Sequence, residues 1–225
     1  VKDQSVAAKL CPKTTMGCKR LCVDSDYYKT FNRDNVSLVD INAQPIKTIT
    51  EHVLSTANAE YRFDSLILAT GFDAMTGALL DIKIQGSKTL TLSEHWAEGP
   101  LNYLGLMMNG FPNLFTITGP GSPSVLSNMI VAIEQHVDFI GDLLIFMRQN
   151  GKRNFEATRQ AEIDWVQQVN GIAEQTLYTS GCSSWYLGAN IPGKPKIFMP
   201  YIGYPSYVEK CNEIAADNYH GIEFS

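Results

Sequence analysis

The chain has 225 residues, of which 44% are hydrophobic and 18% charged, and its net charge is −5. These values are typical of a globular protein with a sizeable core. The acidic balance and the lack of a long Lys/Arg cluster exclude a nucleic-acid-binding surface as the main function. No apolar run reaches the ~18 residues of a membrane-spanning helix and no signal peptide is visible, so we expect neither nucleic acid nor membrane as a partner.

The first 72 residues predict a short helix and then several short strands. The helix covers residues 4–10, and a Pro/Gly/Lys loop follows it to about Arg20. Apolar runs between turns rich in Asn, Asp and Thr predict strands at residues 36–40, 46–49, 52–54 and 66–68. This density of strands fits the closing half of a dinucleotide-binding domain, with a small β-meander before its last strand.

Residues 111–136 predict a buried strand that turns directly into a helix. Residues 114–118 are apolar or β-branched, and Gly119-Pro120-Gly121 ends the run. Ser122 is a good N-cap and Pro123 suits the first helical position. Such a junction directs unpaired backbone N–H groups and the positive end of a helix dipole at one point, where phosphates and heterocycle edges bind. The segment therefore predicts a cofactor site.

Two long helices are predicted in the C-terminal region. The first runs from Pro123 to about Gln149 and stops at Asn150-Gly151. Its apolar residues, spaced alternately by four and three, are interpreted as core packing: Leu126, Ile130, Ile133, Val137, Ile140, Leu144 and Met147. The second covers about residues 155–177, with one apolar face made by Ile163, Val166, Val169 and Ile172.

A long Gly/Pro/Ser loop follows, from Tyr178 to Gly203, and it contains Trp185 and Tyr186. Loops of this length in compact domains are often functional lids or disordered, and the aromatic residues and prolines favour order.

The cysteines favour neither a metal site nor a disulfide framework. They are Cys11, Cys18, Cys22, Cys182 and Cys211. Their spacings fit no zinc pattern, so no metal is expected. An odd number of cysteines is more typical of reduced thiols in a cytosolic protein, which predicts a cytoplasmic location.

Several blocks of this chain, in this order, resemble the C-terminal part of a type I Baeyer–Villiger monooxygenase. The blocks are residues 26–28, 31–36, 66–73, 77–79, 96–100, 103–106, 111–136 and 184–195. The family belongs to the class B flavoprotein monooxygenases and includes phenylacetone, cyclohexanone and steroid monooxygenases. Its members use FAD, NADPH and O2 to insert one oxygen atom next to a ketone carbonyl, which gives an ester or lactone.

The resemblance implies an α/β fold. The chain would be the C-terminal part of a Rossmann-like flavoprotein with two dinucleotide-binding domains, two long helices and a long C-terminal loop. Residues 1–72 would close the NADP-binding domain, together with a connecting loop. Residues 73–225 would form the C-terminal half of the FAD-binding domain.

The family's two dinucleotide fingerprints are missing from the sequence. No Gly-x-Gly-x-x-Gly follows a predicted strand. None of the histidines lies in the family signature Phe-x-Gly-x-x-x-His-x-x-x-Trp, and the chain opens on Val1. We expect the N-terminal half to be absent from this chain and to act as its partner, so that the chain alone is inactive.

Arg20 is the predicted catalytic residue. Oxygen insertion develops negative charge near the flavin, so a fixed cation there lowers the barrier. Arginine suits this role because it stays protonated and donates from a planar fork. The resemblance implies that Lys19 helps to hold the NADPH 2′-phosphate and that an aspartate of the missing half orients Arg20. Without the family context, a Lys-Arg pair in a loop is usually a solvated surface pair.

The resemblance implies further cofactor and substrate contacts. Trp185 would contact the nicotinamide cofactor; the alternative role is an aromatic anchor for its loop, and the two roles can coexist. The predicted pocket beside the flavin is shaped by Ser124, Val125 and Leu126. The residues predicted to face or approach the cofactors are Asn128, Met129, Thr70 and Gly71. Core packing is the alternative role of Leu126 and Met129.

Two other functions stay open. A related flavin monooxygenase could oxidise nitrogen or sulfur, but Trp185 and the Lys19-Arg20 pair favour the ketone-oxidising family. The chain could instead be a non-catalytic remnant, or a partner for a separate N-terminal chain. Its composition does not indicate which ketone is the substrate.

Overall fold

The computed structural model describes every residue except Cys182 and Asn190, and it divides the chain into two units. Unit 1 consists of Val1–Thr14 and Leu21–Gly71, and unit 2 of Thr15–Arg20 and Phe72–Ser225. Among the described residues, none of the helices is long and apolar enough to cross a membrane.

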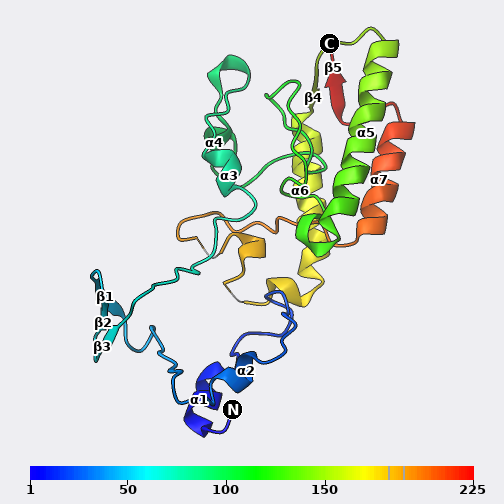
Figure 1. Ribbon diagram of the computed structural model, residues 1–225. Helices are drawn as coiled ribbons and strands as arrows, with labels where there is room; N and C mark the ends of the chain where they lie inside the picture. The colour runs from blue at the N-terminus through cyan, green and yellow to red at the C-terminus, as the bar shows by residue number, and fades with distance from the viewer. Residues whose placement is uncertain (182, 190) are drawn as a thin grey trace. The chain divides into compact units, whose positions relative to one another are not determined.

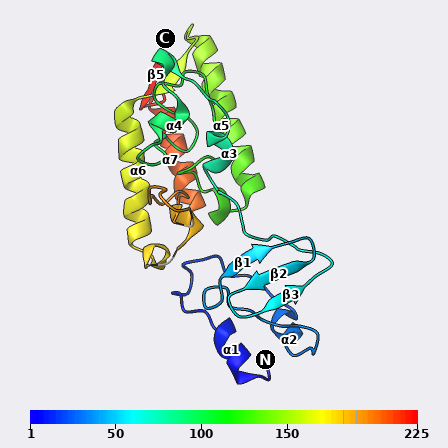
Figure 2. The same cartoon turned by 90° about the vertical axis from the view of Figure 1, so that its left-hand side faces the viewer.

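Unit 1 combines short helices with a three-stranded antiparallel meander (Figure 2). Its elements are α1 (Gln4–Leu10), α2 (Tyr27–Thr30), β1 (Ile46–Ile49), β2 (Val53–Thr56) and β3 (Glu60–Arg62). Asp3 caps α1, because its side chain accepts hydrogen bonds from the backbone N–H groups of Ser5 and Val6. The predicted helix and the first two strands of the meander are confirmed, whereas β3 was not expected from Glu-Tyr-Arg.

Two of the predicted strands in unit 1 are wrong. Residues 36–40 and 66–68 have no strand structure, and Ile67 and Leu68 are 87% and 72% exposed. A strand forms only where another strand satisfies its backbone hydrogen bonds. The described part of the chain pairs no strand with either segment. These residues have the composition of a buried strand without the neighbours that would bury it.

Unit 2 packs three helices around an aromatic core, next to a two-stranded sheet. Its helices are α3 (Gly77–Leu80), α4 (Leu92–His95), α5 (Met129–Gln149), α6 (Arg159–Glu174) and α7 (Tyr204–Ala216). The strands are β4 (Phe155–Ala157) and β5 (Ile222–Phe224), which pair antiparallel, and short 3-10 turns include η2 (Ser124–Leu126) and η4 (Trp185–Leu187). Helices α5 and α7 lie side by side (Figure 1).

The core of unit 2 is built around Trp165 of α6. Its ring stacks on Tyr201 with centroids 5.3 Å apart, and its indole N–H donates a 3.1 Å hydrogen bond to the carbonyl of Gly121. Tyr207 of α7 contacts the same rings. Two long helices are present as predicted, α5 and α6. The second is shorter than the predicted 155–177, because residues 155–157 pair with β5 as β4 and α6 begins at Arg159, after its cap Thr158. Helix α7 was not predicted, although Pro205 in its first turn is a typical helix-start residue.

Helix α5 begins later than predicted. Pro123 leads only into η2, Ser127 is extended, and Asn128 caps α5 by accepting a 3.1 Å hydrogen bond from the Ile130 N–H. The predicted end at Gln149 is confirmed. The buried face consists of Ala132, His136, Phe139, Leu143 and Met147.

The prediction that the four-three row of apolar residues on α5 packs in the core is therefore mostly wrong within this chain. Ile130, Val137 and Leu144 are 65%, 54% and 49% exposed. The four-three spacing selects a face about 100° away from the buried face, and α7 is the helix that packs beside α5.

Residues 114–118 do not form the predicted strand either. The Thr116 N–H donates a 2.8 Å hydrogen bond to the Leu106 carbonyl, and the Thr118 N–H donates to Nδ1 of His136 at 3.2 Å. These local partners replace a strand ladder, and Thr118 takes a left-handed conformation with φ of 53°.

The expectation of reduced thiols is wrong for Cys18, and Cys182 lies outside the described residues. Cys18 is buried and disulfide-bonded, whereas Cys11 is exposed and Cys211 is buried, and neither of these two forms a disulfide.

Candidate functional site

The Gly119-Pro120-Gly121 turn is packed tightly against the rest of unit 2. A Cβ atom on Gly119 would lie 2.5 Å from the Gly105 carbonyl oxygen, so only glycine fits there. The Gly121 N–H donates to the carbonyl of Met199, and the Ser122 N–H donates to that of Gly119 at 3.1 Å. The prediction of unpaired N–H groups at this turn is therefore wrong, because protein carbonyls accept from them.

The segment after the turn forms one side of the candidate site. Ser124 is buried in a left-handed conformation with φ of 43°, and its hydroxyl lies 3.8 Å from the sulfur of Met75. Val125 and Leu126 are half-buried and pack on the core of unit 2. The Ser127 hydroxyl donates a 3.2 Å hydrogen bond to the Ser124 carbonyl, which closes η2.

Arg20 is held against this segment. Its side chain is exposed, and Nη1 donates a 2.7 Å hydrogen bond to the carbonyl oxygen of Val125. Residues 15–20 belong to unit 2, and the Thr15 hydroxyl contacts the Ser180 carbonyl at 3.5 Å. This hydrogen bond orients the guanidinium of Arg20 toward the backbone of η2.

The N-terminus of α5 adds positive potential to the same region. Asn128 and Met129 are exposed and follow η2 after the single residue Ser127. The first N–H groups of a helix carry the positive end of its dipole. Arg20 and the start of α5 are thus joined through η2, and both favour an anionic group.

Trp185 lies on the loop that Arg20 also approaches. It is half-buried in η4, and its ring centroid is 4.4 Å from that of Tyr186. Burial raises the pKa of the Tyr186 hydroxyl, and Tyr178 adds to this effect, whereas the positive charge of Arg20 opposes it. Arg20 is therefore close enough to η4 to act on it electrostatically.

The structure brings most of the predicted site residues together in unit 2. Arg20, η2, Asn128 and Met129 form one group, and Tyr186 connects it to Trp185. Lys19 is exposed on the same segment as Arg20. Thr70 and Gly71 belong to unit 1, where they are exposed and Gly71 has φ of 90°. They are not part of the group described here.

Two polar residues near this group, Lys194 and His136, were not identified from the sequence. Lys194, in the loop after Trp185, forms an ion pair with Asp73. His136 is fully buried on α5, where burial lowers its pKa to about 4. Both residues lie within or beside the family-like blocks, but nothing in their spacing indicates their partners.

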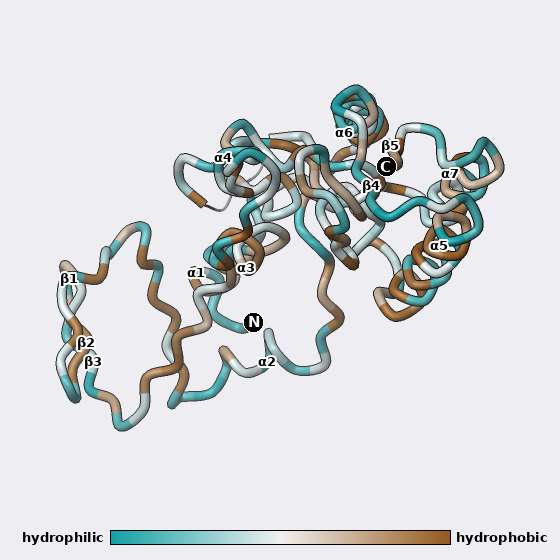
Figure 3. The backbone as a smooth tube through the Cα atoms, turned by 90° about the horizontal axis from the view of Figure 1, so that it is seen from above, coloured by the Kyte–Doolittle hydropathy of each residue, from teal (hydrophilic) through white to brown (hydrophobic). Residues whose placement is uncertain are grey.

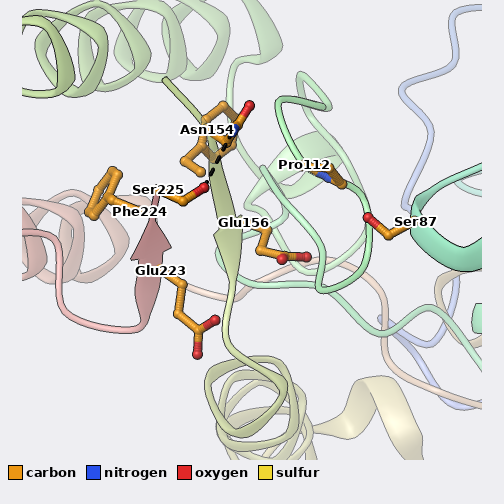
Figure 4. Close-up of a pocket in the computed structure, with 8 residues that line it drawn as sticks. Ser87, Pro112, Asn154, Glu156, Glu223, Phe224 and Ser225 are labelled. Atoms are coloured by element: carbon orange, nitrogen blue, oxygen red, sulfur yellow. Dashed lines mark hydrogen bonds between the residues drawn. The ribbon is translucent and has the colours of Figure 1, made fainter. Parts of the chain in front are cut away.

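A separate pocket lies between β4, β5 and nearby loops (Figure 4). Glu156 and Glu223 stand opposite each other in the β4–β5 register, and the Asn154 amide donates a 3.3 Å hydrogen bond to the Ser225 hydroxyl. None of the predicted site residues lines this pocket.

Comparison with known proteins shows which proteins this chain is similar to. No protein-family model matches it. Cyclohexanone 1,2-monooxygenase of Acinetobacter sp. is 40% identical over 224 residues, which cover 97% of this chain and 40% of the relative. The matching part of such relatives is their C-terminal part. The chain is a homologue of the C-terminal part of Baeyer–Villiger monooxygenases.

Solved structures agree with this relationship. A steroid monooxygenase bound to NADP is 45% identical, with a TM-score of 0.90, and the match covers 100% of this chain and 42% of that one. The OTEMO complex with FAD and NADP is 38% identical, with a TM-score of 0.93 and the same coverage. The predicted α/β fold is confirmed, and the chain spans about 40% of the length of the curated relatives that it matches.

Another relative is named as an N-monooxygenase. Phenazine N-monooxygenase PhzNO1 of Lysobacter antibioticus is 38% identical over 223 residues, which cover 98% of this chain and 40% of the relative.

Proposed function

We propose that this chain is the C-terminal part of an FAD- and NADPH-dependent Baeyer–Villiger monooxygenase. The complete enzyme inserts one oxygen atom of O2 next to a ketone carbonyl to give an ester or lactone. In this proposal residues 1–72 close the NADP-binding domain and residues 73–225 form the C-terminal half of the FAD-binding domain. The chain needs the N-terminal part for activity.

The residues present fit one side of a site for anionic dinucleotides. Arg20 and Lys19 place two cations on one exposed segment, and the positive end of α5 follows η2. Phosphates and electron-rich ring edges are the groups that such a surface attracts. When bound, the flavin supplies the redox chemistry with NADPH and O2.

Each residue of the group has a separate role in this proposal. Arg20 is the catalytic residue and stabilises negative charge that develops beside the flavin. Its hydrogen bond to Val125 keeps the guanidinium in place while Ser124, Val125 and Leu126 shape the wall of the ketone pocket. The residues assigned to cofactor contacts are Lys19, Asn128, Met129, Trp185, Thr70 and Gly71.

The contact of Arg20 with the Val125 carbonyl carries the proposal. It joins the proposed cation to the proposed pocket wall, although the two are 105 residues apart. Without that contact, Lys19-Arg20 would be an ordinary surface pair.

A chimera tests the proposed reaction. This chain replaces the matching C-terminal part of the Acinetobacter cyclohexanone monooxygenase, which is 40% identical to it. We expect ketone-dependent NADPH oxidation together with an ester or lactone product, and no such activity from the chain alone. A folded, flavin-loaded chimera that oxidises NADPH without forming either product contradicts the proposal.

Nitrogen oxidation is the second candidate, because the phenazine N-monooxygenase matches as much of the chain. The same chimera distinguishes the two, since an N-oxide from a phenazine and no ester from any ketone would favour the second. A cytoplasmic location stays a prediction, and the disulfide at Cys18 does not support the reduced thiols on which it depends.

A further inference from the structure

Helix α3 fixes the short segment before it, residues 73–77, on the second apolar core of unit 2. Two leucines of α3, Leu79 and Leu80, pack against the buried cluster that contains Trp96. Figure 3 shows that α3 is largely hydrophobic, as expected of a helix that packs in this way. The segment before α3 therefore has a firm base within unit 2.

Two side chains of this segment reach residues of the candidate site. Met75 takes a left-handed conformation with φ of 69°, and its sulfur lies 3.8 Å from the Ser124 hydroxyl in η2. The Asp73 carboxylate forms an ion pair with the ammonium group of Lys194, in the loop after Trp185. One short segment thus contacts both the proposed pocket wall and the loop that carries Trp185.

The ion pair is packed closely on both sides. The Lys194 side chain is 11% exposed and that of Asp73 is 41% exposed. A Cβ atom on Gly77 would lie 2.7 Å from the Cβ of Asp73. A Cβ atom on Gly188 would lie 3.3 Å from Cδ of Lys194, so glycine at both positions leaves room for the paired side chains. A largely buried ammonium group is costly without a partner, so the loop position depends on the carboxylate.

Backbone hydrogen bonds connect Lys194 to Trp185. The Lys194 N–H donates to the Ile191 carbonyl at 3.3 Å, and the Ile191 N–H donates to that of Gly188 at 3.2 Å. The Gly188 N–H donates to the Trp185 carbonyl at 3.1 Å. An ion pair at Lys194 therefore restrains the backbone at Trp185.

We propose that Asp73 and Lys194 are positioning residues, whose ion pair holds Trp185 in place for the nicotinamide cofactor. The inference rests on the proposed function, in which Trp185 contacts NADPH. In this proposal neither charged side chain touches the cofactor, because Asp73 acts through Lys194 and Lys194 acts through its loop. Since Met75 of the same segment contacts Ser124, the cofactor loop and the ketone pocket share one base.

Amide hydrogen exchange of the isolated chain, followed by mass spectrometry, tests the restraint. Asp73→Asn leaves the Lys194 ammonium without its partner, so peptides that contain Trp185 should exchange at least ~10-fold faster. Adding Lys194→Met to Asp73→Asn removes the unpaired charge and should reverse part of the change. Glu213→Gln, which breaks the exposed Lys210–Glu213 pair of α7, is the matched control and should leave these peptides unchanged.

The affinity of the folded chimera for NADP+ tests the consequence, and titration calorimetry measures it without turnover. Asp73→Asn is expected to weaken binding about 10-fold, because the binding-competent position of the loop is less populated. Lys194→Arg keeps the charge and should bind nearly as well as the wild type. A chimera without monooxygenase activity contradicts the proposed function, whereas the calorimetry still decides the role of the ion pair.

Each outcome decides the proposal. Faster exchange and weaker NADP+ binding in Asp73→Asn, with binding retained in Lys194→Arg, support it. Unchanged exchange in Asp73→Asn overturns it, because the loop would then not depend on the ion pair. Faster exchange with unchanged NADP+ affinity also overturns it, because the restraint would then have no effect on the cofactor.

Discussion

The guanidinium of Arg20 donates a 2.7 Å hydrogen bond to the carbonyl oxygen of Val125. A backbone carbonyl cannot lose its acceptor character by protonation, so the contact persists across the working pH range. The pocket segment itself therefore orients the proposed catalytic cation. An aspartate from the N-terminal part, expected from the family resemblance, would be an additional partner of Arg20.

Arg20→Ala in the chimera is expected to lower kcat for ketone oxidation by roughly 10²–10³-fold, because one charged donor beside the developing negative charge is removed. Arg20→Lys keeps the charge but loses the planar fork, so an intermediate loss is expected. Steady-state kinetics of ester or lactone formation measure both effects. Arg153→Ala, at an exposed position outside the candidate site, is the control and should leave kcat unchanged. Equal kcat values for Arg20→Ala and the control would rule out the assignment.

Gly119→Ala is expected to destabilise unit 2 by about 1–3 kcal/mol, because the new methyl would lie 2.5 Å from the Gly105 carbonyl oxygen. Urea unfolding followed by tryptophan fluorescence measures the change in the free energy of unfolding. Gly171→Ala on α6 is the matched control, since a Cβ there meets nothing within 4 Å, and it should stabilise by about 0.5–1 kcal/mol. A Gly119→Ala protein as stable as the control would show that the turn is not tightly packed.

The buried His136 predicts a stability that falls in mild acid. Nδ1 accepts from the Thr118 N–H, so Nε2 carries the proton and donates to the Tyr207 hydroxyl at 3.1 Å, which in turn donates to the Leu104 carbonyl at 2.8 Å. This network uses the neutral ring. Burial lowers the pKa of His136 from 6.5 to about 4.

Below pH 6.5 the unfolded chain binds a proton that the folded ring excludes, so stability is lost as the pH falls toward 4. The whole effect is on the order of 3 kcal/mol, from the shift in the pKa. Urea unfolding of the wild-type chain and of His136→Gln at several pH values isolates it. The wild type should lose its advantage over the variant as the pH falls, and parallel curves would contradict this account.

Glu162 is a fully buried carboxylate whose partners converge from three elements. Oε1 accepts from the Asn109 N–H and lies 2.9 Å from Nε2 of His95, while Oε2 lies 3.3 Å from Nη1 of Arg159. Glu162→Ala leaves these groups without their acceptor, so a loss of about 3–5 kcal/mol is expected. Thermal or urea unfolding measures it. The exposed Glu174 of α6, changed to Ala, should cost less than about 0.5 kcal/mol, and similar losses for both variants would show that the cluster contributes little.

Local patterns predicted α1, α5, α6 and the first two strands of the meander, but not α7 or β3. The stop at Asn150-Gly151 and the turn residues that bound β1 and β2 lie within a few residues of the elements that they delimit. The same kind of signal failed for residues 66–68 and 114–118, because an apolar run indicates burial but not the partner. The first run is exposed, and in the second Leu106 and His136 accept the backbone hydrogen bonds.

The candidate site was predictable only through the family resemblance. Nothing near Lys19-Arg20 in the sequence indicates a contact with Val125. A Lys-Arg pair alone does not indicate a functional site, because such pairs are usually solvated surface residues. The error at α5 is instructive, since the pattern identified a real apolar row but could not show that His136 and Leu143 occupy the core instead. Helix periodicity identifies faces, and only packing decides which face is covered.

Titration with FAD, followed by visible absorption, tests the central claim that this chain holds only part of a flavin site. The account predicts no perturbed flavin band for the isolated chain, and a perturbed band at a stoichiometry near one for the chimera. A band of equal strength with the isolated chain would contradict it, because these residues would then form a complete site. Absence of the band from a folded chimera would equally contradict it.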